Sequence, residues 1–178
     1  DERLTRGGAV VRRAASRFVG FNLSTDGRKP LVLATNPGYF WRADGAREVS
    51  ANLEMRYKPA SNIQFSVAPS FYLFDSPTQY VASFDDESAT GFYGRRTVFG
   101  SLSQRTVSMD TRLNVTFTPD LSLELFAQPF ISSGAYTDFK QYDVPRELGM
   151  SVYGQDVGTI RTLGAGEDRK YEVDPDGA

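Results

Sequence analysis

Leu53-Glu-Met-Arg-Tyr-Lys-Pro-Ala-Ser-Asn-Ile-Gln-Phe-Ser-Val-Ala-Pro-Ser-Phe71 has a second version in the chain, Leu113-Asn-Val-Thr-Phe-Thr-Pro-Asp-Leu-Ser-Leu-Glu-Leu-Phe-Ala-Gln-Pro-Phe-Ile131. Matching positions are 60 residues apart throughout, since 113 − 53 = 60, and Pro59 matches Pro119. Each copy predicts a strand, a tight turn that contains proline, and a returning strand. A hairpin repeated at fixed spacing predicts a single sheet built by repetition.

Both copies alternate between apolar and polar side chains, as strands with two different faces do. Along 107–117 one set is Val, Met, Thr, Leu, Val and Phe, and the other set is Ser, Asp, Arg, Asn and Thr. The same alternation occurs along 49–57, 63–71 and 121–131. Two architectures produce it: a soluble sandwich with the apolar set in its core, and a membrane barrel with the apolar set facing lipid.

The length of the alternating runs favours the barrel. A tilted strand needs about 9–11 residues to cross a bilayer, whereas strands of soluble proteins commonly have about 5–6. Aromatic residues also gather near the expected strand ends, as in the aromatic girdles of outer-membrane barrels. We therefore predict membrane-interface positions for Tyr39, Trp41, Tyr57, Phe71 and Phe117. Core aromatics of a soluble β protein are the alternative reading of these residues.

The predicted connections fall into two groups. Short turns are expected at 26–30, 58–62 and 118–120. The opposite strand ends carry the connection 42–46, a long connection at 75–103, and everything after Ser132. Short periplasmic turns and long extracellular loops are typical of bacterial outer-membrane barrels. We predict membrane strands within about 15–133, an extracellular hairpin at about 78–103, and an extracellular loop region at about 134–178.

Composition excludes several classes of function. The chain has 178 residues, no cysteine and no histidine, with a formal net charge of −2. These absences rule out Ser-His-Asp and Cys-His catalysis and a conventional zinc site within this chain. The charge and the lack of a basic stripe argue against binding nucleic acid. The chain contains no run of about 18 apolar residues, so the sequence predicts no transmembrane helix.

Six membrane spans are predicted, and a closed single-chain barrel needs about eight strands. Because open edges in hydrocarbon leave backbone groups unpaired, we expect further strands of the same protein to complete the barrel. The absence of a signal peptide at Asp1 fits the same expectation. The predicted spans are 15–25, 30–41, 47–58, 62–74, 104–118 and 120–133.

Seven stretches stand out in order along the chain: Thr5–Gly8, Ser24–Pro30, Gln79–Val81, Tyr93–Arg96, Thr111–Ser122, Ala127–Phe130 and Val173–Gly177. Together they resemble the carboxy-terminal barrel of an outer-membrane family catalogued as domain of unknown function 5916. The resemblance covers nearly the whole chain. It implies a Gram-negative outer-membrane location, an upstream module similar to family-9 carbohydrate-binding modules, and no established catalytic residues.

Five charged residues are predicted to point into the barrel lumen: Glu54, Arg56, Asp110, Arg112 and Glu124. Lumen charges tune permeation in pores, so these residues are candidates for a selectivity cluster. The alternative is a structural ion-pair network that keeps partly buried charges compensated. Nothing in the sequence singles out a catalytic carboxylate pair among them.

The loops offer weaker candidates. Asp85-Asp86-Glu87 could bind a divalent cation or form a solvated loop, and Asp174, Asp176 and Gly177 only partly match a calcium loop. Arg95 and Arg96 could hold a phosphate or a sugar, or could close a hairpin in which 79–84 pairs with 97–102.

Two local features complicate the spans. Pro69 and Pro129 fall inside predicted strands, where they suggest bulges. The segment 31–37 is apolar in both sets, so its lipid-facing set cannot be chosen.

We expect an all-β, antiparallel, up-and-down segment of an outer-membrane barrel that acts as a pore or scaffold linked to a carbohydrate-binding module. Outer-membrane lipid, the remaining strands and carbohydrate bound by the upstream module are the expected partners; no enzyme activity, cofactor or metal is expected. The alternatives are a soluble carbohydrate-binding β-sandwich, using Trp41 and nearby tyrosines, and a barrel with hydrolase activity.

Overall fold

The computed structural model describes residues 3–175, which form two compact units. Unit 1 contains the residues before Ser16, the segment Ser76–Leu102 and the residues from Tyr136 onward. Unit 2 contains Ser16–Asp75 and Ser103–Ala135. Three long strands contribute residues to both units.

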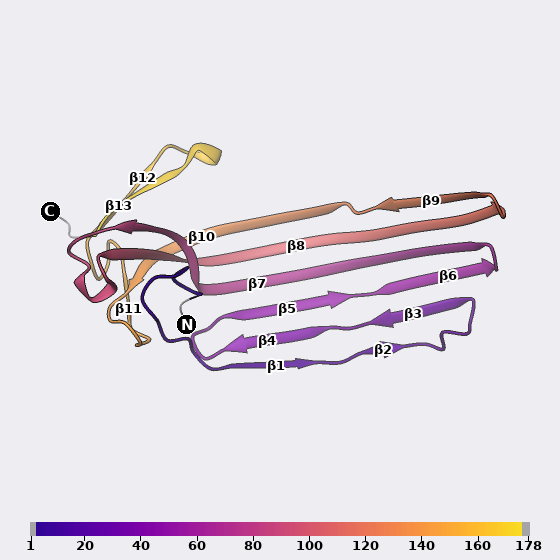
Figure 1. Cartoon of the computed structure of the whole chain (residues 1–178), viewed down its shortest axis with the longest axis horizontal. Helices are drawn as coiled ribbons and strands as arrows, with labels where there is room; N and C mark the ends of the chain where they lie inside the picture. The colour runs from indigo at the N-terminus through magenta and orange to yellow at the C-terminus, as the bar shows by residue number, and fades with distance from the viewer. Residues whose placement is uncertain (1–2, 176–178) are drawn as a thin grey trace. The chain divides into compact units, whose positions relative to one another are not determined.

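Unit 2 is an antiparallel meander that follows the chain order (Figure 1). The six predicted spans pair with their neighbours in sequence order, and several are broken into two strands. The prediction of an all-β antiparallel up-and-down fold is confirmed. The strands with residues in unit 2 are β1 (Ser16–Gly20), β2 (Leu23–Ser24), β3 (Leu31–Thr35), β4 (Gly38–Arg42), β5 (Arg47–Asn52), β6 (Glu54–Ala60), β7 (Ile63–Asp85), β8 (Arg95–Thr118), β9 (Leu121–Ala127) and β10 (Phe130–Tyr142).

The registers sort unit 2 into two faces by residue number. Apart from local shifts beside two turns, paired residues are odd with odd and even with even: Leu33 lies opposite Met55, and Leu113 opposite Leu125. Because side chains alternate along a strand, the odd-numbered residues form one face, which we call the apolar face. The even-numbered residues form the polar face. Leu31 and Leu33 therefore belong to the apolar face, which answers the ambiguity of 31–37.

The apolar face of unit 2 is exposed. Ile131 is 78% exposed and Leu23 is 61% exposed, and leucine, valine and phenylalanine are exposed on several strands between them. Within residues 3–175, both clusters of buried apolar side chains belong to unit 1. Unit 2 is thus a single open sheet layer with an uncovered apolar face.

Prolines mark the places where strands are interrupted. Strand structure is interrupted between β9 and β10, next to Pro129. It is also interrupted between β5 and β6 at Leu53, which faces Pro69. Proline has no N–H, but its carbonyl can still accept a ladder hydrogen bond. Pro69 accepts one from Leu53 N (3.1 Å), and Pro129 accepts one from Met109 N (3.0 Å). The prolines therefore keep neighbouring strands in register despite the interruptions.

The two repeated hairpins turn at different points of the repeat. The first turns at Ser61–Asn62, because Ala60 pairs with Ile63, so Pro59 lies in β6. The second turns at Pro119–Asp120, because Thr118 pairs with Leu121. Subtracting the offset of 60 places the second turn at 59–60, two residues earlier. A slip of two residues leaves every side chain on its face, so both hairpins present the same apolar set.

Unit 1 contains the end of the β7–β8 hairpin and most of β10, together with β11 (Met150–Val152), β12 (Thr159–Leu163) and β13 (Lys170–Asp174). The hairpin between 79–84 and 97–102 is confirmed, and its tip carries a short 3-10 helix, η1 (Thr90–Phe92). A second one, η2 (Gly166–Asp168), joins β12 to β13. The predicted loop region 134–178 therefore contains strands, which are too short and polar to stand out in the sequence.

Two small cores hold unit 1 together. Phe99, which is 1% exposed, packs with Val11 and meets the ring of Tyr142 edge-on at 5.3 Å. The second core is formed by Val98, Phe139 and Tyr153. Among the described residues there is no helix with the length and hydropathy required to cross a bilayer.

Candidate functional site

The five charged residues predicted as a lumen cluster all lie on the polar face of unit 2, since all are even-numbered. Glu54 and Arg56 on β6 form an ion pair of 2.5 Å. Arg112 on β8 lies over the ring of Phe126, its partner on β9, at 4.7 Å. Glu124 faces Asn114 across the same strand pair. The structure thus distributes these charges in separate pairs and does not gather all five.

Asp110 differs from the other four charged residues. Its Oδ1 atom is buried and has no hydrogen-bond partner among the described residues. The hydrogen bonds Thr116 N–Asn62 O and Ser70–Ser108 fix the register of β7 and β8. Asp110 and Arg112 are two residues apart on β8, so they lie in adjacent rows across the polar face. Partly compensated charge is what both the selectivity reading and the structural reading of this face predict.

All five predicted interface aromatics have odd residue numbers. Tyr39, Trp41, Tyr57 and Phe71 lie on the apolar face, and Phe117 lies within the register shift beside the second turn. Tyr39 and Trp41 stack on β4 with ring centroids 5.3 Å apart. Tyr57 and Phe117 precede the two tight turns, and Phe71 lies on β7. Four of them, all except Trp41, are among the exposed large apolar residues.

A charged group that the sequence analysis missed lies at one end of the apolar face. Asp75 accepts hydrogen bonds from Arg47 Nε (2.7 Å), Ser103 Oγ (2.8 Å) and Arg105 Nη1 (2.9 Å). Desolvation alone would raise the pKa of Asp75, but the hydrogen bonds from Arg47, Ser103 and Arg105 lower it to about 2. We call these four residues the Asp75 cluster; they tie β5, β7 and β8 together.

The signal for the Asp75 cluster is present in the sequence. Arg47, Asp75 and Arg105 stand at or next to corresponding ends of three consecutive predicted spans. Adjacent spans run antiparallel, so these ends meet at one edge of the sheet. A single span gives no sign of the cluster, which becomes visible only when the ends of neighbouring spans are compared.

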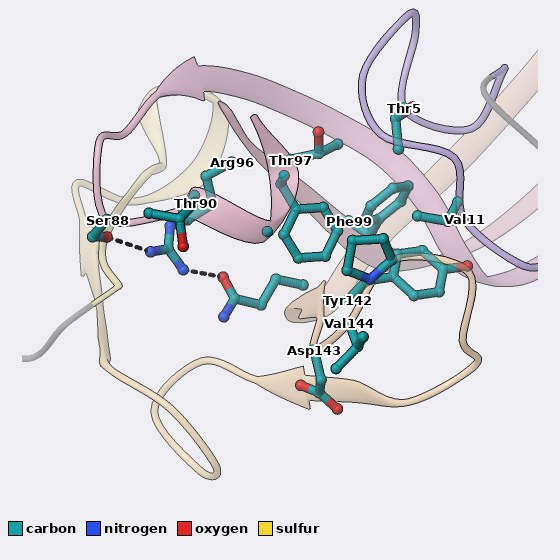
Figure 2. Close-up of a pocket in the computed structure, with 15 residues that line it drawn as sticks. Thr5, Val11, Ser88, Thr90, Arg96, Thr97, Phe99, Tyr142, Asp143 and Val144 are labelled. Atoms are coloured by element: carbon teal, nitrogen blue, oxygen red, sulfur yellow. Dashed lines mark hydrogen bonds between the residues drawn. The ribbon is translucent and has the colours of Figure 1, made fainter. Parts of the chain in front are cut away.

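Unit 1 contains a cavity of about 320 Å³ between the hairpin tip and the end of β10 (Figure 2). Its apolar wall includes Val11 and Phe99, and Ser88 and Arg96 contribute polar atoms. Arg96 donates to Asp86 from Nε, to Gln141 Oε1 from Nη1 (2.6 Å) and to Ser88 Oγ from Nη2 (2.9 Å). All three guanidinium nitrogens are therefore engaged within unit 1, as expected for an arginine that closes the hairpin.

The acidic stretch Asp85-Asp86-Glu87 is not arranged as a cation site. Hydrogen bonds from Ser88 and Arg96 lower the pKa of Asp86 to about 2. Across the described part of the chain, no three His, Cys, Asp or Glu side chains lie close enough together to hold a metal ion. Of the partial calcium-loop match, Asp176 and Gly177 lie outside the described residues.

Comparison with known proteins gives one assignment. No curated protein and no solved structure shows significant similarity to the chain. The family model described as "Domain of unknown function (DUF5916)" matches residues 3–155, a range that holds the whole of unit 2 and the cavity-lining residues of unit 1. The repeated hairpins and the ordered motifs of this all-β chain therefore belong to a protein of the DUF5916 family.

Proposed function

We propose that the chain is a segment of a bacterial outer-membrane β-barrel and acts, without catalysis, as a pore or membrane scaffold. The observation that carries this proposal is the exposed apolar face of unit 2. A single sheet layer with leucine, valine and phenylalanine exposed on one face is unfavourable in water, because burial of apolar area is the main stabilising force of folding. Lipid is the environment in which such a face is stable.

The polar face supports the same proposal. It carries serine, asparagine, threonine and the five charged residues, as the inner surface of a barrel does, together with the exposed rings of Phe18, Phe126 and Phe130. We propose that this face lines an aqueous interior, with the Glu54–Arg56 pair and Asp110 on its wall. Further strands of the same protein would pair with the free backbone groups of β1 and β9.

The connections suggest the orientation. The tight turns near 26–30, 61–62 and 119–120 would face the periplasm, and the segments 78–103 and 134–175 would lie at the cell surface. The resemblance described above implies an upstream sugar-binding module, and we propose that the barrel anchors that module at the outer membrane.

A soluble sandwich is the main rival. It needs a second layer packed on the apolar face, and the described residues of unit 2 provide only one layer. The proposal therefore depends on what covers the apolar face in the intact protein.

Spin-label accessibility tests this directly. The 178 residues contain no cysteine, so labels within them are site-specific once any cysteine elsewhere in the intact protein is replaced. Leu113→Cys, Asn114→Cys, Val115→Cys and Thr116→Cys are labelled one at a time in the intact protein in liposomes. Lipid-soluble oxygen should relax the labels at 113 and 115, and a water-soluble nickel chelate those at 114 and 116. Equal access of the nickel chelate to all four labels would show that the apolar face is not in lipid.

A second strand provides the matched control. Leu123 and Glu124 lie opposite Val115 and Asn114, so Leu123→Cys should behave like the 115 label and Glu124→Cys like the 114 label. If the two strands alternate in opposite senses, the shared-face argument is wrong.

A further inference from the structure

We propose that the Asp75 cluster, together with Arg17, binds the phosphate group of an anionic lipid in the outer leaflet. This inference rests on the proposed function, because it requires the apolar face to lie in the membrane. It adds a ligand class and a set of residues to that function.

Arg17 lies in the same row of the apolar face as Arg47 and Asp75. Registers place Arg17 opposite Trp41, Trp41 opposite Arg47, and Arg47 opposite Asp75. These four residues are odd-numbered, so they form one row on the apolar face. The row crosses β1, β4, β5 and β7 at the ends away from the tight turns. In the proposed orientation this is the level of the lipid headgroups on the outer side of the membrane.

Both arginines of the Asp75 cluster have guanidinium N–H groups that are not used within the described part of the fold. Arg47 uses only Nε for Asp75, and Arg105 uses only Nη1 for Asp75, Ser103 and the carbonyl of Gln104. The remaining guanidinium N–H groups of both residues have no hydrogen-bond partner among the described residues. Arg96 in unit 1 is the opposite case, with all three nitrogens engaged.

The site has surplus positive charge. Arg17 and Arg47 in the row and Arg105 beside Asp75 bring three guanidinium groups to a single carboxylate, and the Arg17 side chain forms no hydrogen bond or ion pair with described residues. Asp75 holds two of the arginines by one nitrogen each, so it fixes their position without neutralising both. Arginine binds phosphate oxygens through charge-assisted, often bidentate hydrogen bonds. The site therefore has surplus positive charge and oriented donors.

Trp41, which belongs to the row, stacks on Tyr39 of the same face with ring centroids 5.3 Å apart. Tyrosine and tryptophan favour the headgroup level of a membrane because their rings are amphipathic. Aromatic rings at this level and arginines next to them place the phosphate, rather than the acyl chains, against the guanidinium groups.

Native mass spectrometry of the intact protein tests the proposal. The protein is released from vesicles of phosphatidylcholine that contain diphosphoryl lipid A, or the same lipid with its phosphates removed. We expect the phosphorylated form to remain bound to the wild type and the dephosphorylated form to be lost. Equal retention of the two forms would show that acyl chains alone are recognised and would overturn the proposal.

Two variants locate the site. Arg47→Gln combined with Arg105→Gln should reduce retention of the phosphorylated lipid by at least about tenfold, because the loss of even one strong charge-assisted contact has an effect of that size. Since this pair also supports the fold, Arg17→Gln is the second variant, and it should weaken retention without changing unfolding. Unchanged retention in Arg17→Gln and in the double variant contradicts the proposal.

The matched control is Arg112→Gln, which removes one arginine from the polar face. It should leave lipid retention unchanged, and an equal loss would mean that only net charge matters. Inorganic phosphate, added as a competitor, should not displace the lipid, whereas full displacement would assign the site to free phosphate. If the spin labels at 113–116 show no alternation, the proposed function and this inference both fail. If they alternate but retention does not depend on phosphate, only this inference fails.

Discussion

Leu53 donates its backbone N–H to the carbonyl oxygen of Pro69 over 3.1 Å, at the residue that separates β5 from β6. Pro69 cannot donate in return, so this bond connects the two strands at a point where the ladder is weakest. The adjoining register of β5 and β7 ends at the pair Asn52–Ser70, and that of β6 and β7 begins at Met55–Val67. The single hydrogen bond therefore bridges the gap between two separately registered stretches.

Leu53→Pro should destabilise the intact protein by about 1–3 kcal/mol, because the carbonyl of Pro69 loses its donor. The measurement is urea unfolding of the reconstituted protein. Leu53→Ala keeps the N–H and serves as the control for the lost side chain. Equal destabilisation by the two variants would mean that the hydrogen bond contributes nothing.

With the apolar face in lipid, as proposed, Leu113→Arg should lower the free energy of unfolding by about 2–4 kcal/mol, the cost of arginine at the bilayer midplane. Thr116→Arg, on the polar face of the same strand, should have a small effect. Unfolding of both variants in liposomes of the same composition gives the comparison. The prediction is wrong if Thr116→Arg is as destabilising as Leu113→Arg.

Asp75→Asn should destabilise the protein at neutral pH by about 1 kcal/mol, a modest value because the cluster is partly solvated. The folded pKa of Asp75 is about 2, below its ordinary value of 3.8. A depressed folded pKa stabilises the protein above the unfolded pKa, and this stabilisation is lost as pH falls from about 4 towards 2. The difference between wild type and variant should therefore shrink over that interval. A difference that is constant from pH 7 to pH 2 would exclude a role for the carboxylate charge.

Arg96→Ala should expose the tip of the β7–β8 hairpin to protease. Arg96 holds Asp86, Ser88 and Gln141, and its side chain is only 12% exposed. Chymotrypsin should then cleave faster after Phe92 or Tyr93. Arg95→Ala removes the neighbouring, exposed arginine and is the matched control. Identical cleavage rates for the two variants would show that the Arg96 network does not hold the tip.

The alternation of side chains was sufficient to predict the sheet. Leu113 and Leu125 belong to sets that the sequence already separates, and the register confirms that they share a face. The interruptions of the strands were harder to predict, because the interruption at Leu53 lies opposite a proline of another strand, Pro69. Pro59 was expected in a turn, but the first hairpin turns two residues later.

The charged residues show the same limit. Which face carries Glu54 and Arg112 follows from counting along one strand, so it could be predicted. Which charges touch depends on the register of several strands, as the Asp75 cluster shows. The engagement of Arg96 by Gln141, 45 positions later in the chain, could not be derived from local pattern.

The different turn positions of the two hairpins imply a rule for changes in chain length. Insertion or deletion of an even number of residues at a hairpin tip leaves leucine and valine pointing the same way. An odd number would reverse every side chain along the returning strand unless a bulge absorbed the extra residue, as the register shifts beside both turns already do. The tips should therefore tolerate engineered insertions, such as epitope tags, in pairs of residues.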